Sequence, residues 1–354
     1  DNGDLKCWGL DQYGQLGDGG SNTNTNAPSS TAIDLGTGRT AVAVSGGEAH
    51  TCAILDNGEA RCWGRDNYGQ LGNGGNTNQQ SPVAVSGSDT WDSSTGASSG
   101  SGSGSSGSSS FAYANDKLAL GYGHTCAILD TGDMKCWGGN GAGQLGDGST
   151  TSTWGVVPTT PIDLGTGRTA VAISAGAHHT CAILDNGDLK CWGWNGWGQL
   201  GDGSTVSTNT PSSTAINLGT GRTAVAISAG AHHTCAILDN GEAKCWGRDN
   251  SGQLGDGGSN TDTNAPSSTA IDLGMGRTVV AISAGTENTC AILDTGDLKC
   301  WGSDNNGQLG DGGSNTATGQ PSSTAINLGT NRTAVAVSTG NYHTCAILDN
   351  GDLK

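Results

Sequence analysis

One segment of about 55 residues recurs along the chain, and this repetition limits the fold more than any other feature of the sequence. The motif CAILD begins at six cysteines, and the motif GQLG begins at six glycines. Neighbouring copies lie 54 or 55 residues apart, except for one interval of 74 residues. A repeat of this length is typical of solenoids and propellers, in which each unit buries its core against its neighbours.

Each unit contains four short apolar segments with turn residues between them. In the copy at residues 170–218 the segments are AVAIS, HTCAIL, DLKCWG and TAINL. None has the period of an amphipathic helix, whereas four short strands per repeat are typical of a propeller blade. We therefore expect an all-β fold, a β-propeller of four-stranded blades. Complete blades are expected at about 40–85, 117–165, 169–219, 223–274 and 278–329.

The two ends of the chain carry complementary parts of one unit. Residues 1–36 contain the third and fourth segments, and residues 334–354 contain the first and second. We expect these halves to form a sixth blade that closes a single propeller over residues 1–354. However, DNGDLK occurs at both 1–6 and 349–354, and a closed six-bladed ring holds one copy. A seven-bladed ring, a longer array or the joining of separate copies is therefore the alternative.

The spacing of the cysteines predicts hairpin disulfides. If residues 185–187 form a three-residue hairpin loop with Gly187 in the left-handed conformation, Cys181 faces Cys191 across the hairpin. Facing residues of antiparallel strands lie within disulfide range. Five pairs of cysteines share this ten-residue spacing: Cys52–Cys62, Cys126–Cys136, Cys181–Cys191, Cys235–Cys245 and Cys290–Cys300.

The two remaining cysteines, Cys7 and Cys345, are predicted to pair with each other and to lock the ring. Disulfides indicate an oxidising compartment, so we expect an extracellular or cell-surface protein. The sequence has no CxxC motif, and we expect no metal site of the zinc type.

A second turn can be predicted by comparing the residues at one position in different copies of the repeat. Gly38, Gly167, Gly221 and Gly276 precede an Arg-Thr pair, and Asn331 takes this place in the last copy. Because glycine and asparagine most readily adopt positive φ, we expect a left-handed residue at all five positions.

Charge excludes several classes of partner. The formal net charge is −17, from 32 acidic and 15 basic residues. Binding to a phosphate backbone requires clusters of Lys and Arg, and the sequence has none, so nucleic acid is not an expected partner. Membrane insertion is not expected either, because no run of 18 apolar residues occurs.

The pattern AG.HHTCAIL..G.LKCWG.N..GQLGDG resembles the repeat of the regulator-of-chromosome-condensation family. The matching residues are Ala175, Gly176, His179, Thr180, Gly187, Trp192, Gly193, Asn195 and the run 198–203. The resemblance covers nearly the whole chain and implies a propeller, usually of seven blades. Members of the family include nucleotide exchange factors, light sensors and β-lactamase-inhibiting proteins, so it also implies binding of macromolecules through loops on one face. The cysteine pairs are not part of the general pattern and suggest a secreted, bacterial-type branch.

Two polar positions recur and are interpreted as structural. One holds His50, His124, His179, His233, His343 and, in the remaining unit, Asn288. Because a catalytic group needs a distinct environment and this position has six copies, we expect these residues to form structural hydrogen bonds. The Asp-Gly pairs after GQLG are interpreted as turns, with calcium binding as the alternative. No other cofactor is expected.

Recognition is expected where the units differ, because shared residues cannot form a unique site. Four tryptophans lie outside the CWG motif, and aromatic residues in loops are frequent in binding sites. The insertion 86–116 contains the tract SSGSGSGSSGSSS, which we interpret as a spacer or a partner-binding arm. The candidate binding residues are Trp91, Trp154, Trp194, Trp197, Phe111 and Tyr113. Packing within their own loops is the alternative for these side chains.

These observations favour a propeller that recognises protein or glycan through loops on one face. The near-identical units and complementary ends support an alternative, a structural subunit of an extracellular assembly or filament. We do not expect an enzyme, because the sequence lacks phosphate-binding loop and HExxH motifs.

Overall fold

The structure of the chain is a computed structural model that describes residues 5–20, 22–93, 117–258, 260–313 and 315–354. These residues form eighteen strands and no helix, which confirms the all-β class. The first of six antiparallel sheets contains β1 (Ala41–Gly46), β2 (His50–Leu55), β3 (Ala60–Gly64) and β4 (Gln79–Ala84). The second sheet contains β5 (Leu118–Leu120), β6 (His124–Ile128) and β7 (Met134–Gly138), and the third contains β8 (Ala170–Ala175), β9 (His179–Leu184) and β10 (Leu189–Gly193). The fourth contains β11 (Ala224–Ala229), β12 (His233–Leu238) and β13 (Ala243–Gly247), and the fifth contains β14 (Val279–Ala284), β15 (Asn288–Leu293) and β16 (Leu298–Gly302). The last sheet contains β17 (Ala334–Thr339) and β18 (Thr344–Leu348).

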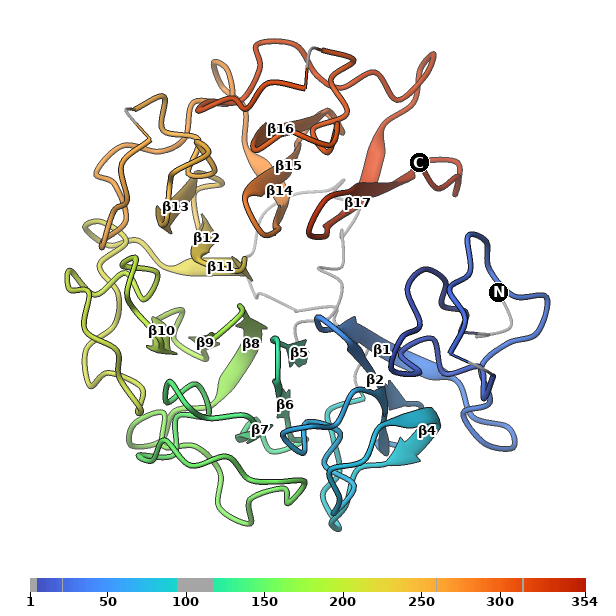
Figure 1. Cartoon of the computed structure of the whole chain (residues 1–354). Coiled ribbons are helices and arrows are strands. Elements are labelled where there is room, and N and C mark those ends of the chain that lie inside the picture. The colour runs from blue at the N-terminus through green and yellow to red at the C-terminus, as the bar shows by residue number, and fades with distance from the viewer. Residues whose placement is uncertain (1–4, 21, 94–116, 259, 314) are drawn as a thin grey trace, which may run out of the picture.

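The sheets are arranged around a common centre, as in a propeller (Figure 1). The first strand of each sheet lies innermost, so the centre is surrounded by β1, β5, β8, β11, β14 and β17. The cavity at the centre is lined by residues such as Val44, Ser174 and Ile227 and extends to the N-terminal segment at Cys7 and Trp8, with a total volume of about 910 Å³. The sheets remain separate from one another, so the number of blades and the closure of the ring stay predictions.

The fourth segment of the repeat forms a full strand in one sheet only among the described residues. In the β8–β10 unit, Gly193 forms a single bridge with Thr208, and Ile216 N–H donates to Leu189 O at 2.8 Å. The side chains of Ile216 and Leu218 pack into the core of this unit. The segment is therefore held by burial rather than by a ladder of hydrogen bonds. The prediction of four-stranded blades is wrong for the units whose sheets have only three or two strands.

The core lies between neighbouring sheets, which explains how a chain with few large apolar residues folds. Trp192 is fully buried, and its indole N–H donates to Gln144 O of the preceding unit at 3.0 Å. Gly146 approaches the same ring so closely that a Cβ atom there would lie 2.5 Å from the indole nitrogen. The same bond joins Trp63 to Gln15, Trp137 to Gln70, Trp246 to Gln199 and Trp301 to Gln253. The CWG and GQLG motifs are thus two halves of one contact between units.

The turns have the predicted geometry. Cys181 faces Cys191 and Ile183 faces Leu189 in the β9–β10 hairpin, and Gly187 has a φ of 80°. All five predicted hairpin disulfides are present, each with a Cα–Cα distance of 4.1 Å. The predicted positive φ is also confirmed at Gly38, Gly167, Gly221, Gly276 and Asn331.

The predicted disulfide between the two ends is not formed, because Cys7 and Cys345 are both free. After β18 the chain turns back, and Lys354 pairs with Ala346 through two backbone hydrogen bonds of 2.9 Å. The last residues therefore occupy the third-strand place beside β18. This is the place that the segment around Cys7 was predicted to fill.

The N-terminal segment lies instead beside the β1–β4 sheet and apart from β17 (Figure 1). Thr51 Oγ1 donates to Gln15 O at 2.9 Å, which joins this segment to the β1–β4 sheet in the way that other neighbours are joined. The halves 1–36 and 334–354 do not share a sheet in the described residues. As a result Trp8, expected in the core with the other CWG tryptophans, is 44% exposed.

Candidate binding site on the variable face

The two ends of the sheets form faces that differ in how far the units vary. One end carries the hairpin loops between the second and third strands together with the Gly-Arg-Thr turns. The arginine of each turn forms an ion pair of 3.2–3.4 Å with the aspartate that begins the hairpin loop: Arg39–Asp56, Arg168–Asp185, Arg222–Asp239, Arg277–Asp294 and Arg332–Asp349. We call this end the repeated face. The opposite end, with the loops between the first and second strands and the loops after the third, is the variable face.

On the variable face, the same loop positions carry different residues from unit to unit. The two positions before the repeated histidine or asparagine hold Glu48-Ala49, Tyr122-Gly123, Ala177-His178, Ala231-His232, Thr286-Glu287 and Asn341-Tyr342. The position after CWG holds Leu10, Arg65, Gly139, Trp194, Arg248 and Ser303. A site with a unique composition can therefore be built on this face.

One pocket of about 460 Å³ collects these differing residues. Its lining includes Tyr68 and Tyr122 from two neighbouring units, and Trp194 and His232 from the two units that follow. The Tyr122 ring lies edge-on to His178, with 5.6 Å between ring centroids, and Trp194 lies edge-on to His232 at 5.4 Å. Contacts between rings thus hold the aromatic walls of the pocket in place.

The pocket carries little net charge at neutral pH. Glu48 and Arg65 form an ion pair of 3.6 Å at its edge. Burial lowers the pKa of His178, and the Glu48 carboxylate offsets this in part. Burial also lowers the pKa of His232, and the Arg248 guanidinium lowers it further. Both imidazoles are therefore neutral near pH 7, where they can donate and accept hydrogen bonds.

Two of the predicted tryptophans extend this surface. The Trp197 ring lies edge-on to Trp194 at 6.1 Å, and the guanidinium carbon of Arg248 lies 5.2 Å from the Trp197 ring centre. Trp154 lies 6.4 Å from the ring of Tyr68. The exposed fraction is 38% for Trp197 and 54% for Trp154. Trp194 therefore lines the pocket, whereas Trp197 and Trp154 each contact one of its lining rings, Trp194 and Tyr68 respectively.

The prediction that Trp91 is a binding residue is wrong. Trp91 is 2% exposed and packs against the core residue Trp137, with 5.4 Å between ring centroids. Its backbone bridges Leu129, so the segment before the insertion belongs to the core of the next unit. Phe111, Tyr113 and residues 94–116 of the insertion lie outside the described residues.

Several residues of the pocket were not singled out from the sequence, above all Glu48, Tyr68 and Tyr122. Each sits at a position that differs between the copies. An alignment of the six copies therefore contains a signal for them, because variation inside an otherwise constant repeat marks positions that packing does not dictate.

Four of the five repeated histidines are structural, as predicted, whereas His343 in the last unit is exposed. The Nε2 atoms of His50, His124, His179 and His233 lie 2.9–3.0 Å from a threonine hydroxyl of the next unit. All four side chains are buried, and burial lowers their pKa to about 3. Asn288 replaces the histidine in the β14–β16 unit, and its Nδ2 donates to Thr344 Oγ1 of the next unit at 3.4 Å.

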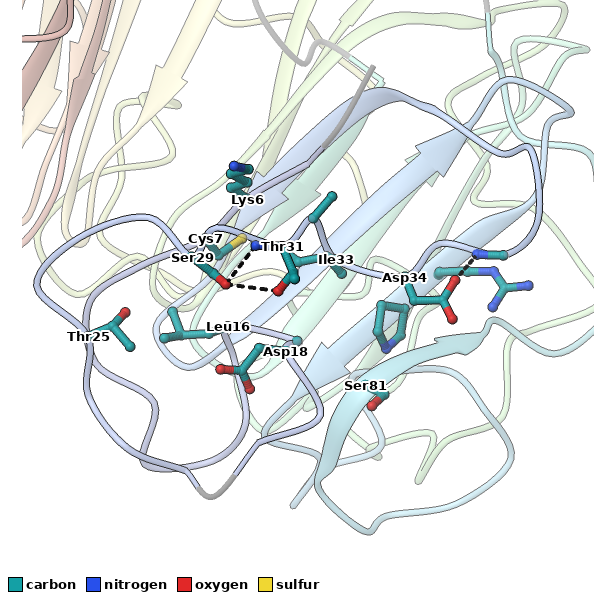
Figure 2. A pocket seen from close by; sticks show the side chains of 15 residues that line it. Lys6, Cys7, Leu16, Asp18, Thr25, Ser29, Thr31, Ile33, Asp34 and Ser81 are labelled. Carbon is teal, nitrogen blue, oxygen red and sulfur yellow. Dashed lines mark hydrogen bonds between the residues drawn. The ribbon is translucent and has the colours of Figure 1, made fainter. Parts of the chain in front are cut away.

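A second pocket, of about 260 Å³, lies between the N-terminal segment and the β1–β4 sheet (Figure 2). Cys7, Leu16 and Ile33 line it, and they occupy positions that belong to the repeat core. Ser29 Oγ accepts from the Thr31 N–H and pairs with the Thr31 hydroxyl, as dashed in Figure 2, and both contacts recur at Ser212–Thr214, Ser267–Thr269 and Ser322–Thr324. Burial raises the pKa of the Cys7 thiol to about 11. This pocket therefore offers repeated residues and an unreactive thiol rather than distinct chemistry.

The described residues contain no group of three or more His, Cys, Asp or Glu side chains placed to hold a metal ion. The part of the chain that the structure describes also contains no helix capable of crossing a membrane.

Two curated proteins illustrate how the chain relates to known sequences. It is 28% identical to the ultraviolet-B receptor UVR8 of Arabidopsis thaliana, over 99% of this chain and 72% of that protein. It is 24% identical to the human E3 ubiquitin-protein ligase HERC2, over 77% of this chain and 5% of the ligase.

Solved structures show the same fold. The structure of yeast RCC1 (Prp20) bound to Kap60 matches with a TM-score of 0.76 at 20% identity, over 97% of this chain and 76% of that one. Human WBSCR16 matches with a TM-score of 0.76 at 19% identity, over 98% and 87%. The RCC1-like domain family matches residues 1–346, and the chain therefore belongs to this family.

Proposed function

We propose that this chain is a non-catalytic binding propeller that holds a protein partner on its variable face. The observation that carries the proposal is the pocket between Tyr68, Tyr122 and Trp194, which combines side chains from four units. A partner side chain inserted there would be surrounded by fixed aromatic rings. Exposed Trp197 and the adjacent Arg248 would extend the contact, and Trp, Tyr and Arg are the residues that dominate binding energy at interfaces.

A protein partner is also supported by a relative. Yeast RCC1, which shares the fold, has been solved bound to Kap60. The repeated face is a weaker candidate here, because its five Arg–Asp pairs present the same chemistry to solvent in every unit.

We propose that the chain is not catalytic because neither the buried histidines nor those of the pocket are placed to act as a general base. The four buried histidines are hydrogen-bonded between units and lie away from solvent. His178 and His232 face the pocket, and their ring neighbours are aromatic side chains rather than an activated nucleophile. A general base needs such a group within hydrogen-bond reach.

An extracellular or cell-surface location is the second part of the proposal. Five disulfides in short hairpins support it, because such bonds persist in oxidising compartments. Peptide mapping of the protein isolated from its source, with thiols blocked at lysis, tests this part. Reduced Cys181 and Cys191 in that material would contradict it.

The binding site is tested by comparing wild type with a Trp194→Ala/Trp197→Ala double variant. The matched control is Met275→Ala, because Met275 is fully exposed on the repeated face. Each protein is immobilised and offered proteins from the medium of the source culture, and retained proteins are purified and re-measured by biolayer interferometry. We expect at least one partner whose affinity falls about tenfold or more in the double variant and stays unchanged in the control. Equal affinity for all three proteins would show that the variable face is not the binding site.

A glycan is the second candidate ligand, favoured by the neutral character of the pocket. Aromatic walls stack on sugar rings, and the imidazoles of His178 and His232 can bond to hydroxyl groups. A glycan array probed with the same three proteins distinguishes the candidates. Binding of one glycan class that is lost only in the double variant would favour the glycan over the protein.

A further inference from the structure

One buried polar position alternates between asparagine and aspartate along the repeat. It lies three residues before GQLG and holds Asp11, Asp66, Asn140, Asn195, Asp249 and Asp304. All six are buried. The two side chains differ in charge and in their hydrogens, so the loop around them must satisfy a donor in some units and an acceptor in others.

In the asparagine units, the loop forms a cage of oxygen atoms around the amide nitrogen. Asn140 Nδ2 lies 3.1–3.3 Å from four oxygens, which are Asp147 Oδ1, Ser149 O, Ser149 Oγ and Thr151 O. Asn195 Nδ2 has the equivalent four neighbours at 3.1–3.4 Å. An amide that carries two hydrogens satisfies such a cage.

Asp66 occupies the same place, and two hydrogen bonds around it are equivalent to those around Asn140. Its Oδ1 atom accepts from Leu71 N–H at 2.9 Å, just as Asn140 Oδ1 accepts from Leu145 N–H at 3.0 Å. Gly75 N–H donates to Asn73 Oδ1 at 3.0 Å, as Ser149 N–H donates to Asp147 Oδ1 at 2.8 Å. These loops also have the same length.

The second oxygen of Asp66 therefore takes the position of an NH₂ group. By the equivalence of the two loops it faces Asn73 Oδ1, Gly75 O and Thr77 O. Asp66 is 0% exposed, and its Oδ2 atom is buried with no hydrogen-bond partner among the described residues. A carboxylate turned toward other oxygens, without water or a donor, is strongly unfavourable unless a cation or a proton lies between them.

We propose that the Asp66 loop binds a calcium ion, which replaces the two amide hydrogens found in the Asn140 loop. The ligands would be Asp66 Oδ2, Asn73 Oδ1 and the carbonyl oxygens of Gly75 and Thr77, completed by water. A set of hard oxygen ligands without nitrogen or sulfur suits calcium rather than zinc. A single carboxylate gives a weak site, with a dissociation constant of about 0.1–1 mM, as in extracellular modules.

The sequence of the loop follows the identity of the polar residue. In the four units with aspartate at this position, the residue directly after GQLG is followed by Gly-Gly. In the two units with asparagine, it is followed by Gly-Ser. In the asparagine units, the serine supplies one of the four cage oxygens through its hydroxyl. Asp11, Asp249 and Asp304 also accept from the leucine of GQLG at 2.9 Å. Their loops are one residue longer, and Asp249 accepts a further hydrogen bond from the Thr261 backbone, so the proposal concerns Asp66 alone.

The test uses reciprocal exchanges within the repeat. Asp66→Asn places an amide in the Asp66 loop, and Asn140→Asp places a carboxylate in the Asn140 loop, beside the Asp147 carboxylate and the Ser149 hydroxyl. Unfolding by urea is measured for wild type and both variants without calcium and with 10 mM CaCl₂, with MgCl₂ at the same ionic strength as control. Each calcium site should shift the folding equilibrium roughly 10- to 100-fold at this concentration.

We expect the shift of the folding equilibrium on adding calcium to be roughly 10- to 100-fold smaller in Asp66→Asn than in wild type, and larger by the same factor in Asn140→Asp. Calcium bound per chain after equilibrium dialysis should change by one in the same directions. A calcium response that is the same in all three proteins would overturn the proposal. It would also be overturned if calcium had no effect and acidification stabilised wild type relative to Asp66→Asn, since a proton rather than a metal would then neutralise Asp66.

Discussion

His179 Nε2 lies 2.9 Å from Thr234 Oγ1 of the neighbouring sheet, and this contact fixes the tautomer of the histidine. The Thr234 hydroxyl has one hydrogen, which it donates to Gln199 O at 2.9 Å. Its oxygen must therefore accept from the imidazole, so Nε2 carries a hydrogen and Nδ1 does not. His179 Nδ1 is buried and has no hydrogen-bond partner among the described residues. A second proton on this ring would be a buried charge without a partner.

Stability is expected to fall on acidification because of these histidines. Burial lowers the pKa of His179 to about 3 in the folded chain, from 6.5, and the same holds for His50, His124 and His233. Between these two values the unfolded chain binds more protons than the folded one, so protonation favours unfolding. Each histidine should reduce the free energy of unfolding by up to about 1.4 kcal/mol per pH unit below pH 6. Urea unfolding between pH 7.5 and 4.5 measures this dependence.

The variant His179→Asn isolates the contribution of one histidine, because Asn288 holds the equivalent place in another unit. Its free energy of unfolding should depend less steeply on pH than that of wild type. Parallel curves for the two proteins would mean that His179 does not titrate differently in the folded and unfolded chains.

The Thr234 hydroxyl should contribute more to the free energy of unfolding than a single hydrogen bond would, because it satisfies two buried groups at once. Replacing it in Thr234→Val leaves the His179 N–H without an acceptor, at a cost of about 1–3 kcal/mol. Thr234→Ser keeps the hydroxyl and should retain most of the stability. Chemical unfolding of both variants measures the difference, and a valine variant as stable as the serine variant would refute the role of the hydroxyl.

Features set by short stretches of chain could be predicted from the sequence. The Cys181–Cys191 disulfide follows from a loop of three residues whose Gly187 has positive φ, so register and turn determine each other locally. The left-handed Asn331 was identified by comparison with glycines at the same place in other copies. Neither inference depends on how the units are arranged in space.

Features that depend on contacts between distant segments were not predicted correctly. Trp91 resembles a loop aromatic in the sequence, but it takes the place at which the first strand begins in other units and packs on Trp137. Cys7 and Cys345 are complementary in sequence, yet the residues after β18 already fill the place beside that strand. The pocket unites four units, and its composition becomes visible only when the loops of neighbouring sheets are placed side by side.

The two free thiols give a chemical test of the arrangement of the ends. Alkylation of the native protein without reduction should modify Cys7 and Cys345 and none of the ten cysteines in disulfides. Because burial raises the pKa of Cys7 to about 11, its reaction should be slow at pH 8 and accelerate about tenfold per pH unit up to pH 10. Mass spectrometry of the digested protein measures both rates. A peptide that links Cys7 to Cys345 would instead support a ring closed by these residues.

The contact between CWG and GQLG predicts that two similar glycines differ in their tolerance of a methyl group. Gly146 and Gly167 have φ values of 75° and 69°, so alanine at either position costs about 1 kcal/mol through backbone strain. A Cβ at Gly146 would lie 2.5 Å from Trp192 Nε1, whereas no described atom outside its chain neighbours lies within 4 Å of a Cβ at Gly167. In Gly146→Ala the indole must move away and weaken its bond to Gln144 O, which adds about 1–3 kcal/mol. Urea unfolding followed by tryptophan fluorescence compares the two variants. If Gly146→Ala is no less stable than Gly167→Ala, this close approach is not what requires glycine in GQLG.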